Sequence, residues 1–354
     1  MAYTNIDNPE LYFQCKTYTA NNGTQSITFD GSEDMQPDWS WIKCRSQAYN
    51  HALFDSVRGT TKLIRSNQNT AEETHSGTLS AFNSDGFSLN GNDAFTNNGS
   101  ETYVSWNWKA GTSFSNDASA TSVGSIDSAG SVSTTAGFSI IRFGGTGSLG
   151  TVAHGLGAVP HAIFFKRLDT TGAWASYHKP LGATKYMRLD SNSIQITASD
   201  EFNDTEPTST VFTVDTDGGV NASGTNNMIA YCLAPIKGYS SFKSYKGNGS
   251  SDGTFVYTGF KPAWIMIKKA TGSANNWYMM DNKRTPHNVS VKYILADTSA
   301  VEETGSGQER DFLSNGFKIR NSNNGLNTSG ETYIYLAFAE SPLVNSKGVP
   351  TTAR

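Results

Sequence analysis

The side chains best suited to acid–base chemistry stand at one position that recurs along the chain. Asp55, His178 and Asp281 each end a short apolar run, and a carboxylate or imidazole so placed can act as a general acid or base. No serine or cysteine accompanies them in a nucleophile pattern. Arg58 and Arg284 follow the two aspartates by three residues, which is typical of a charge pair that organises a loop. We therefore interpret this position as structural and predict no catalytic residues.

The motifs that could hold a cofactor or a metal ion are incomplete. Residues 145–150 read Gly-Thr-Gly-Ser-Leu-Gly, but a dinucleotide site needs a helix to begin at such a loop, and Thr-Val-Ala-His follows instead. Residues 215–220, Asp-Thr-Asp-Gly-Gly-Val, are rich in oxygen ligands but lack the glutamate that closes a calcium loop. The histidines show no HxH or HExxH spacing, and the cysteines are scattered. We predict neither a cofactor nor a metal site.

Tryptophan pairs offer a surface on which a sugar or a protein partner could stack. Trp39 and Trp41 are separated by a serine, and Trp106 and Trp108 by an asparagine, so each pair faces one side of a strand. Two such pairs exceed the needs of one small core. We single out these four residues as the candidate interface or glycan-stacking site, with one pair exposed. The other tryptophans fall in predicted core strands: Trp174, Trp264 and Trp277.

These residues lie on segments that recur at intervals of roughly 100 residues. The clearest segment is a proline, five intervening residues and a lysine, and the lysine is expected at a solvated strand end. It occurs at 37–43, 160–166 and 262–268. A fixed period indicates one structural unit used in tandem. We predict an N-terminal extension at 1–11, repeats at 12–111, 138–238 and 239–341, a linker at 112–137 and a C-terminal tail at 342–354.

Strand signals dominate the chain. Apolar runs of four to eight residues are rich in β-branched and aromatic types and are bounded by turn residues, and no long helical stripe occurs. The runs at 162–165 and 264–267 are continuously apolar, as expected for strands covered on both faces. We predict an all-β fold of tandem antiparallel β-sandwich repeats in a lectin-like jelly-roll form. The segment 112–137 is almost all Ser, Thr, Ala, Gly and Asp, which favours a linker or surface arm that could add an edge strand.

The overall charge and hydropathy exclude some partners. With 27 Lys and Arg against 31 Asp and Glu, the chain of 354 residues carries a net charge of −4, whereas a nucleic-acid-binding protein would need a basic face. No stretch of 18 apolar residues occurs, so we expect no membrane insertion. The N-terminus lacks the basic and apolar regions of a secretory signal peptide.

Several phrases of the chain are long enough to compare with known families. They include Pro-Asp-Trp-Ser-Trp-Ile-Lys at 37–43 and His-Ala-Leu-Phe-Asp-Ser-Val-Arg-Gly at 51–59, and further phrases at 84–89, 103–111, 152–160, 257–264 and 348–354. Together they resemble tandem-repeat proteins of tailed bacteriophages of aquatic bacteria, usually labelled tail fibre or virion structural protein. The resemblance spans nearly the whole chain and brings no catalytic residues. It implies a structural protein of the virion.

The expected function is that of a non-enzymatic structural protein displayed on a bacteriophage particle. The first form is a tail fibre or spike subunit for host attachment, and the alternatives are a head decoration or head-fibre protein bound to the capsid and a carbohydrate-binding module. A glycan hydrolase would need two carboxylates placed about a sugar bond, and no such pair can be nominated. The expected partners are other virion proteins, further copies of the chain in a homo-oligomer, and a host surface glycan or receptor. The protein would be made in the host cytoplasm and leave by lysis.

Overall fold

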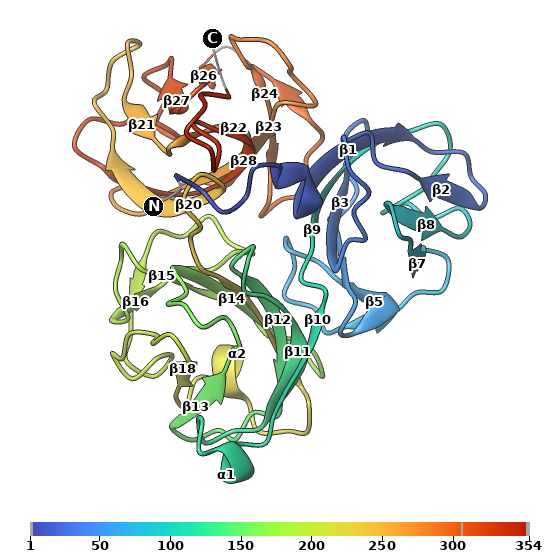
Figure 1. Cartoon of the computed structure of the whole chain (residues 1–354), viewed down its shortest axis with the longest axis vertical. Coiled ribbons are helices and arrows are strands. Elements are labelled where there is room, and N and C mark those ends of the chain that lie inside the picture. The colour runs from blue at the N-terminus through green and yellow to red at the C-terminus, as the bar shows by residue number, and fades with distance from the viewer. Residues whose placement is uncertain (1–2, 306, 352–354) are drawn as a thin grey trace.

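The computed structural model describes residues 3–305 and 307–351 (Figure 1). Strands make up most of its regular structure, and the α-helices α1 (Ala118–Thr121) and α2 (Gly218–Asn221) have four residues each. A short 3-10 helix, η1 (Pro9–Leu11), precedes the first strand. The predicted all-β class is confirmed, with antiparallel sheets in a sandwich-like arrangement.

The first large sheet is built from residues 13–108, which we call the first unit. Its antiparallel strands pair in the order β1-β9-β3-β4-β5-β6, so that the closing strand lies between the first strand and β3. In this register Trp39 lies opposite both Trp108 and Asp55. The strands are β1 (Phe13–Thr19), β3 (Trp39–Cys44), β4 (Ala52–Asp55), β5 (Gly59–Ile64), β6 (Glu73–Thr74) and β9 (Thr102–Trp108).

The third unit, residues 240–342, carries a large sheet with the same connectivity. Its order is β20-β28-β22-β23-β24-β25, and Trp264 lies opposite Phe338 and Asp281. Trp264, Phe338 and Asp281 therefore occupy the positions that Trp39, Trp108 and Asp55 occupy in the first sheet. The strands are β20 (Ser240–Lys246), β22 (Phe260–Lys269), β23 (Trp277–Asp281), β24 (Lys292–Leu295), β25 (Glu303–Thr304) and β28 (Thr332–Pro342).

The second unit, residues 112–233, repeats the central order and extends it at one edge. Its sheet runs β10-β11-β12-β19-β14-β15, and Ala162 lies opposite Leu233 and His178. The strands are β10 (Thr112–Asn116), β11 (Ser128–Ser133), β12 (Phe138–Phe143), β14 (Ala162–Arg167), β15 (Ala175–His178) and β19 (Met228–Leu233).

The segment 112–137 is not a linker, because β10 and β11 belong to the second sheet, where they add strands at one edge as the alternative expectation allowed. Backbone hydrogen bonds hold these strands, and such bonds need no large side chains. One position requires glycine: a Cβ at Gly130 would come within 1.8 Å of the backbone oxygen of Ile140 on β12. The few large side chains of the segment therefore do not prevent it from pairing as strands.

A smaller sheet faces each large sheet across a core that belongs to one unit. In the first unit, Ile27 and Phe87 of the small sheet share a buried cluster with Ile42 and Phe54 of the large sheet. Similar clusters lie in the second and third units. The strands of the small sheets are β2 (Gln25–Ile27), β7 (Leu79–Phe82) and β8 (Phe87–Leu89); β13 (Gly150–Ala153) and β18 (Val211–Val214); and β21 (Phe255–Tyr257), β26 (Arg310–Leu313) and β27 (Gly316–Ile319). Strands β16 (Lys185–Tyr186) and β17 (Ile196–Thr197) form a separate pair.

The other faces of the three large sheets meet in a central core that all three units share. Figure 1 shows the units as three lobes grouped around a common centre, and one buried cluster includes Trp106, Tyr231 and Leu336 from the three closing strands. Each large sheet is thus covered by its small sheet on one face and by the central core on the other. This double cover explains why β14 and β22 are buried along almost their whole length, as their continuous apolar runs predicted.

The N-terminal segment ties the first unit to the third. Ile6 is buried in the central core, and the Tyr3 hydroxyl donates to the backbone oxygen of Gly259, 2.7 Å away. Asp7 accepts hydrogen bonds from the backbone N–H and the hydroxyl of Ser346 at 2.6 and 2.5 Å. The start of the chain and its C-terminal tail therefore meet on the third unit.

Candidate functional site

The four candidate tryptophans lie in the central core and are not on the surface. Trp39 stacks on Tyr231 of the second unit, with ring centroids 4.5 Å apart, and Trp108 meets Trp264 of the third unit edge-on at 5.6 Å. The prediction of an exposed pair is therefore wrong, and no sugar can reach these rings. The extra aromatic area fills a second core that is shared between units. All four are at most 3% exposed: Trp39, Trp41, Trp106 and Trp108.

Indole N–H groups join the later units to the unit before them. Trp174 Nε1 of the second unit donates to the backbone oxygen of Arg65 in the first unit, 2.8 Å away. Trp277 Nε1 of the third unit donates to the backbone oxygen of Arg188 in the second, 2.9 Å away. Because both donors and both acceptors hold equivalent places in the recurring segments, these bonds repeat one inter-unit contact.

A histidine makes the remaining bond of this set. His51 stands where the other units have tryptophan, and its Nε2 lies 3.0 Å from the backbone oxygen of Leu295 in the third unit. Trp41 Nε1 donates to His51 Nδ1 at 2.9 Å, which leaves Nε2 as the protonated nitrogen. Burial lowers the pKa of His51 well below its usual value, so the ring stays neutral. The three bonds close into a cycle of units, which we call the inter-unit ring.

Asp55 is enclosed by donors and cannot meet a substrate. Its side chain and that of Arg58 are fully buried. Oδ1 accepts the backbone N–H groups of Val57 and Arg58 at 3.1 and 2.8 Å. Oδ2 accepts the Arg58 guanidinium and the hydroxyl of Tyr231 from the second unit, the latter at 2.6 Å. Burial raises the pKa of Tyr231 well above its usual value, so the phenol remains a donor.

The third unit repeats this arrangement with a different donor from its neighbour. Arg284 Nε donates to Asp281 Oδ2 at 2.6 Å, and Trp106 Nε1 of the first unit donates to the same oxygen at 3.0 Å. Trp106 and Tyr231 hold equivalent places on their closing strands. A buried aspartate thus occurs where the neighbouring unit offers a polar hydrogen.

The second unit has a different solution at the same position. His178 and Leu181 replace the aspartate and arginine, and the residue equivalent to Tyr231 and Trp106 on the third unit is Leu336. His178 Nε2 lies 3.1 Å from Ser176 Oγ within its own unit. Burial lowers the pKa of His178 to about 3, so a neutral ring takes the place of the charge pair. The recurring acid–base position is structural in all three units, as the sequence indicated.

The recurring lysine is buried, and the expectation of a solvated strand end is wrong. Burial lowers the pKa of Lys43, Lys166 and Lys268 to about 8 in each case. The ammonium groups donate to backbone oxygens. For Lys166 and Lys268, one of these acceptor oxygens belongs to the preceding unit. Lys166 Nζ lies 3.4 Å from the oxygen of Asn69, and Lys268 Nζ lies 2.9 Å from that of Asn192.

The two remaining motifs lead into a strand and into a short helix. The glycine-rich segment 145–150 leads into β13 and not into a helix. In the segment 215–220, Asp217 caps α2 by accepting the N–H of Gly219 at 2.7 Å. Across the described residues, no three or more His, Cys, Asp or Glu side chains gather closely enough to hold a metal ion. No helix in the same part of the chain is long and apolar enough to cross a membrane.

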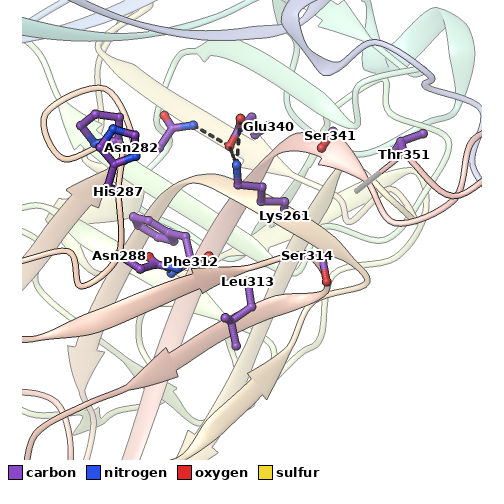
Figure 2. Close-up of a pocket in the computed structure, with 11 residues that line it drawn as sticks. Lys261, Asn282, His287, Asn288, Phe312, Leu313, Ser314, Glu340, Ser341 and Thr351 are labelled. Carbon is purple, nitrogen blue, oxygen red and sulfur yellow. Dashed lines mark hydrogen bonds and ion pairs between the residues drawn. The ribbon is translucent and has the colours of Figure 1, made fainter. Parts of the chain in front are cut away.

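A pocket of about 690 Å³ opens on the third unit (Figure 2). Its polar wall is a connected group of three side chains. Lys261 Nζ lies 2.9 Å from Glu340 Oε2, and Asn282 Nδ2 donates to the same oxygen at 2.8 Å. Figure 2 shows Lys261 and Asn282 pointing toward Glu340 from two sides. The Lys261 and Glu340 side chains are 35% and 37% exposed, so both remain open to the pocket.

The opposite wall is held in place by a paired amide. Asn288 Nδ2 donates to the backbone oxygen of Phe312 at 2.8 Å, and its Oδ1 accepts the N–H of the same residue at 2.9 Å. These two hydrogen bonds hold the loop that carries His287 against β26. Phe312 and Leu313 supply apolar surface to the pocket.

Sequence reasoning missed this pocket. Its lining comes from segments between residues 261 and 351, and no local motif joins them. The available signal was a difference between units, because Lys261, Asn282 and Glu340 have no like residues at the equivalent positions of the first and second units.

Comparison with known proteins gives a family without a described activity. No curated protein and no solved structure matches the chain. A family model described as "Domain of unknown function (DUF7483)" matches residues 8–342, from the N-terminal segment to the end of β28 and through all three units. The chain therefore belongs to the DUF7483 family.

Proposed function

We propose that the protein is a non-enzymatic structural protein displayed on the surface of a bacteriophage particle, where it serves as a tail fibre or spike subunit for host attachment. The observation that carries this proposal is that the side chains at the recurring acid–base position are buried in contacts within the protein. Asp55 and Asp281 bind side chains of a neighbouring unit, and His178 binds Ser176 within its own unit. Recurring polar groups that are buried in contacts within the protein are typical of a structural protein, whereas catalytic groups must reach a substrate.

The shared central core supports the same proposal. The three β-sandwich units share one buried core, which suits a protein that must keep its shape on a particle outside the cell. The sequence phrases that resemble phage tandem-repeat proteins point in the same direction. We further propose that copies of the chain contact each other or other virion proteins through their outer surfaces, since the inner sheet faces are already occupied.

The experiment is to locate the protein on the particle. Antibodies raised against the purified chain are applied to virions of the phage that carries its gene, and gold-labelled particles are imaged by electron microscopy. Label at the tail tip or fibres is the expected result. Label on the capsid would favour a head decoration protein, and virions without label would overturn the virion proposal.

A second measurement tests the non-enzymatic assignment. The purified chain is incubated with polysaccharide from the host envelope, and the polymer length is followed by size-exclusion chromatography. We expect no change in length. A shortened polymer would overturn the proposal, because cleavage requires a catalytic pair that the recurring positions do not supply.

A further inference from the structure

The pocket of the third unit has the chemistry of a binding site for an uncharged ligand. Lys261 and Glu340 neutralise each other through a contact of 2.9 Å, so their charges give the pocket wall no net sign. An anion would have to compete with Glu340 for the ammonium, and a cation would have to compete with Lys261 for the carboxylate. Neither exchange gains an ion pair, which disfavours charged ligands.

The paired charges still have hydrogen-bonding capacity toward the pocket. An ammonium group has three donors and a carboxylate has about four acceptor sites, so the bonds among Lys261, Glu340 and Asn282 leave some of both kinds unused. Donors and acceptors side by side match hydroxyl groups, since each hydroxyl both donates and accepts. A ligand with several neighbouring hydroxyls satisfies this wall best.

The apolar side of the pocket completes the match. Leu313 and the small part of Phe312 that stays outside the core of the third unit form an apolar wall opposite the polar group. A pyranose ring presents hydroxyls at its edges and C–H groups on its faces, so it fits between one polar and one apolar wall. The volume of about 690 Å³ falls within the 300–1,000 Å³ typical of ligand sites.

The pocket is also a feature of one unit only. The positions equivalent to Lys261, Asn282 and Glu340 are Gln36, Ser56 and Ala110 in the first unit and Val159, Lys179 and Pro235 in the second. Neither set contains a cation beside a carboxylate. Groups that hold the scaffold recur in related form between units, whereas this group stands outside that pattern.

We propose that the pocket bounded by Lys261, Asn282, Glu340 and Phe312 binds a neutral saccharide of the host envelope. This proposal rests on the proposed role in host attachment and assigns that role to a place on the molecule. The pair of hydrogen bonds between Asn288 and β26 holds the pocket wall before the ligand arrives, which limits the ordering cost of binding.

The test uses the full chain on an array of neutral mono- to tetrasaccharides, with acidic oligosaccharides as a second panel. The best neutral ligand is then titrated by calorimetry against the wild type, Glu340→Gln and Lys261→Met. We expect each substitution to weaken binding on the order of tenfold to a hundredfold, because a hydrogen bond to a charged group is lost or weakened. The matched control is Gln36→Ala, which alters the equivalent position of the first unit and should leave the affinity unchanged.

The outcomes separate this proposal from the role in attachment. If no neutral saccharide binds, or if binding survives in both pocket variants, the pocket assignment is overturned. Adsorption of the purified chain to host cells in that case would leave the attachment role standing, with a different receptor site. If the saccharide binds in the pocket but the chain is absent from virions, the pocket assignment stands and the virion role fails.

Discussion

Two neighbouring residues of the third unit, Asp281 and Asn282, serve regions with opposite demands. Asp281 points into the central core, where its pair with Arg284 is fully buried. Asn282 reaches the pocket and contacts Glu340, whose pair with Lys261 is about one-third exposed. Burial makes the first charge pair a fixed part of the framework, since neither group can be left alone without a large penalty. Exposure leaves the second pair weak as a source of stability and open to a ligand.

The largest effect that would test this contrast comes from the buried pair. Asp281→Ala removes the buried carboxylate that accepts from Arg284 Nε and Trp106 Nε1 and leaves Arg284 with only the ion pair to Glu302, and we expect the free energy of unfolding to fall by about 3–5 kcal/mol. Urea denaturation followed by tryptophan fluorescence measures the loss. Asn282→Ala is the matched control on the pocket side, and its cost should stay near 1 kcal/mol. Equal losses for the two variants would contradict the contrast.

The second unit offers a further control for the same prediction. Asp55→Ala should be as costly as Asp281→Ala, whereas the combined change Asp55→His, Arg58→Leu and Tyr231→Leu installs the residues found at the corresponding places of the second unit and its neighbour. Because replacing both members of a buried pair is far less costly than removing one partner, and because Glu72 keeps Lys62 beside it when Arg58 is replaced, the triple variant should be more stable than Asp55→Ala. A triple variant less stable than the single one would show that the arrangements cannot be exchanged.

A smaller effect is expected from the inter-unit ring. Trp174→Phe keeps most of the aromatic area but leaves the backbone oxygen of Arg65 without its donor, which should cost about 1–3 kcal/mol. The control is Trp264→Phe, because the buried indole N–H of Trp264 has no hydrogen-bond partner within the described part of the chain. Thermal denaturation should therefore show a lower midpoint for the first variant than for the second. A higher midpoint for Trp174→Phe than for Trp264→Phe would show that the inter-unit ring does not stabilise the contact between the units.

The buried lysines predict a dependence of stability on pH. Burial holds the pKa of Lys43, Lys166 and Lys268 at about 8 in the folded chain, below the ordinary value of about 10.4 in the unfolded chain. Between these values the unfolded chain binds more protons at each lysine, so each lysine contributes stability that rises with pH from about 8 to about 10, by at most about 1.4 kcal/mol per pH unit. Burial raises the pKa of the Cys15 and Cys232 thiols and of Tyr231, and these groups act in the opposite sense, so the measured quantity is the difference between the wild type and Lys166→Met. The slope of Lys166→Met should be lower than that of the wild type over this window, and equal slopes would contradict the assignment.

The smallest expected effect lies on the pocket side. Glu340→Gln removes a charge that is about one-third exposed, so the free energy of unfolding should change by less than about 1 kcal/mol. The same urea titration as for Asp281→Ala measures it. A loss of several kcal/mol would show that the pocket pair is also a framework element, and the contrast would then disappear.

The sequence predicted the strands well because each strand carries its own signal. The continuous apolar runs of β14 and β22 indicated burial on both faces. In the structure each of these strands lies between the core of its own unit and the central core. What a single unit could not reveal is which surface covers the second face. For that reason Trp39 and Trp108 looked surplus to one core, although they fill another. The jelly-roll form stays a prediction.

Two other failures have local physical reasons. The segment 112–137 has few large apolar residues, yet its backbone pairs with β12, and Gly130 fits there because it lacks a side chain. Amino-acid composition indicates how much apolar side chain a segment can bury, but it does not indicate whether the backbone pairs with another strand. The pocket could not be found because Lys261 and Glu340 are distant in the sequence and meet only through the pairing of β22 with β28.

The cycle of units has a consequence for the order in which the chain is made. The bond between His51 and Leu295 joins residues 244 positions apart, and the contact between Asp7 and Ser346 joins residues 339 apart. A ribosome therefore releases the first unit long before its partners exist, with the face that carries Trp39 and Trp106 still uncovered. Domains emerge in sequence during synthesis and expose such surfaces until their neighbours arrive. A chain that stops short of the third unit leaves Trp106 without Asp281 and Trp108 without Trp264, so the central core closes only when the third unit folds.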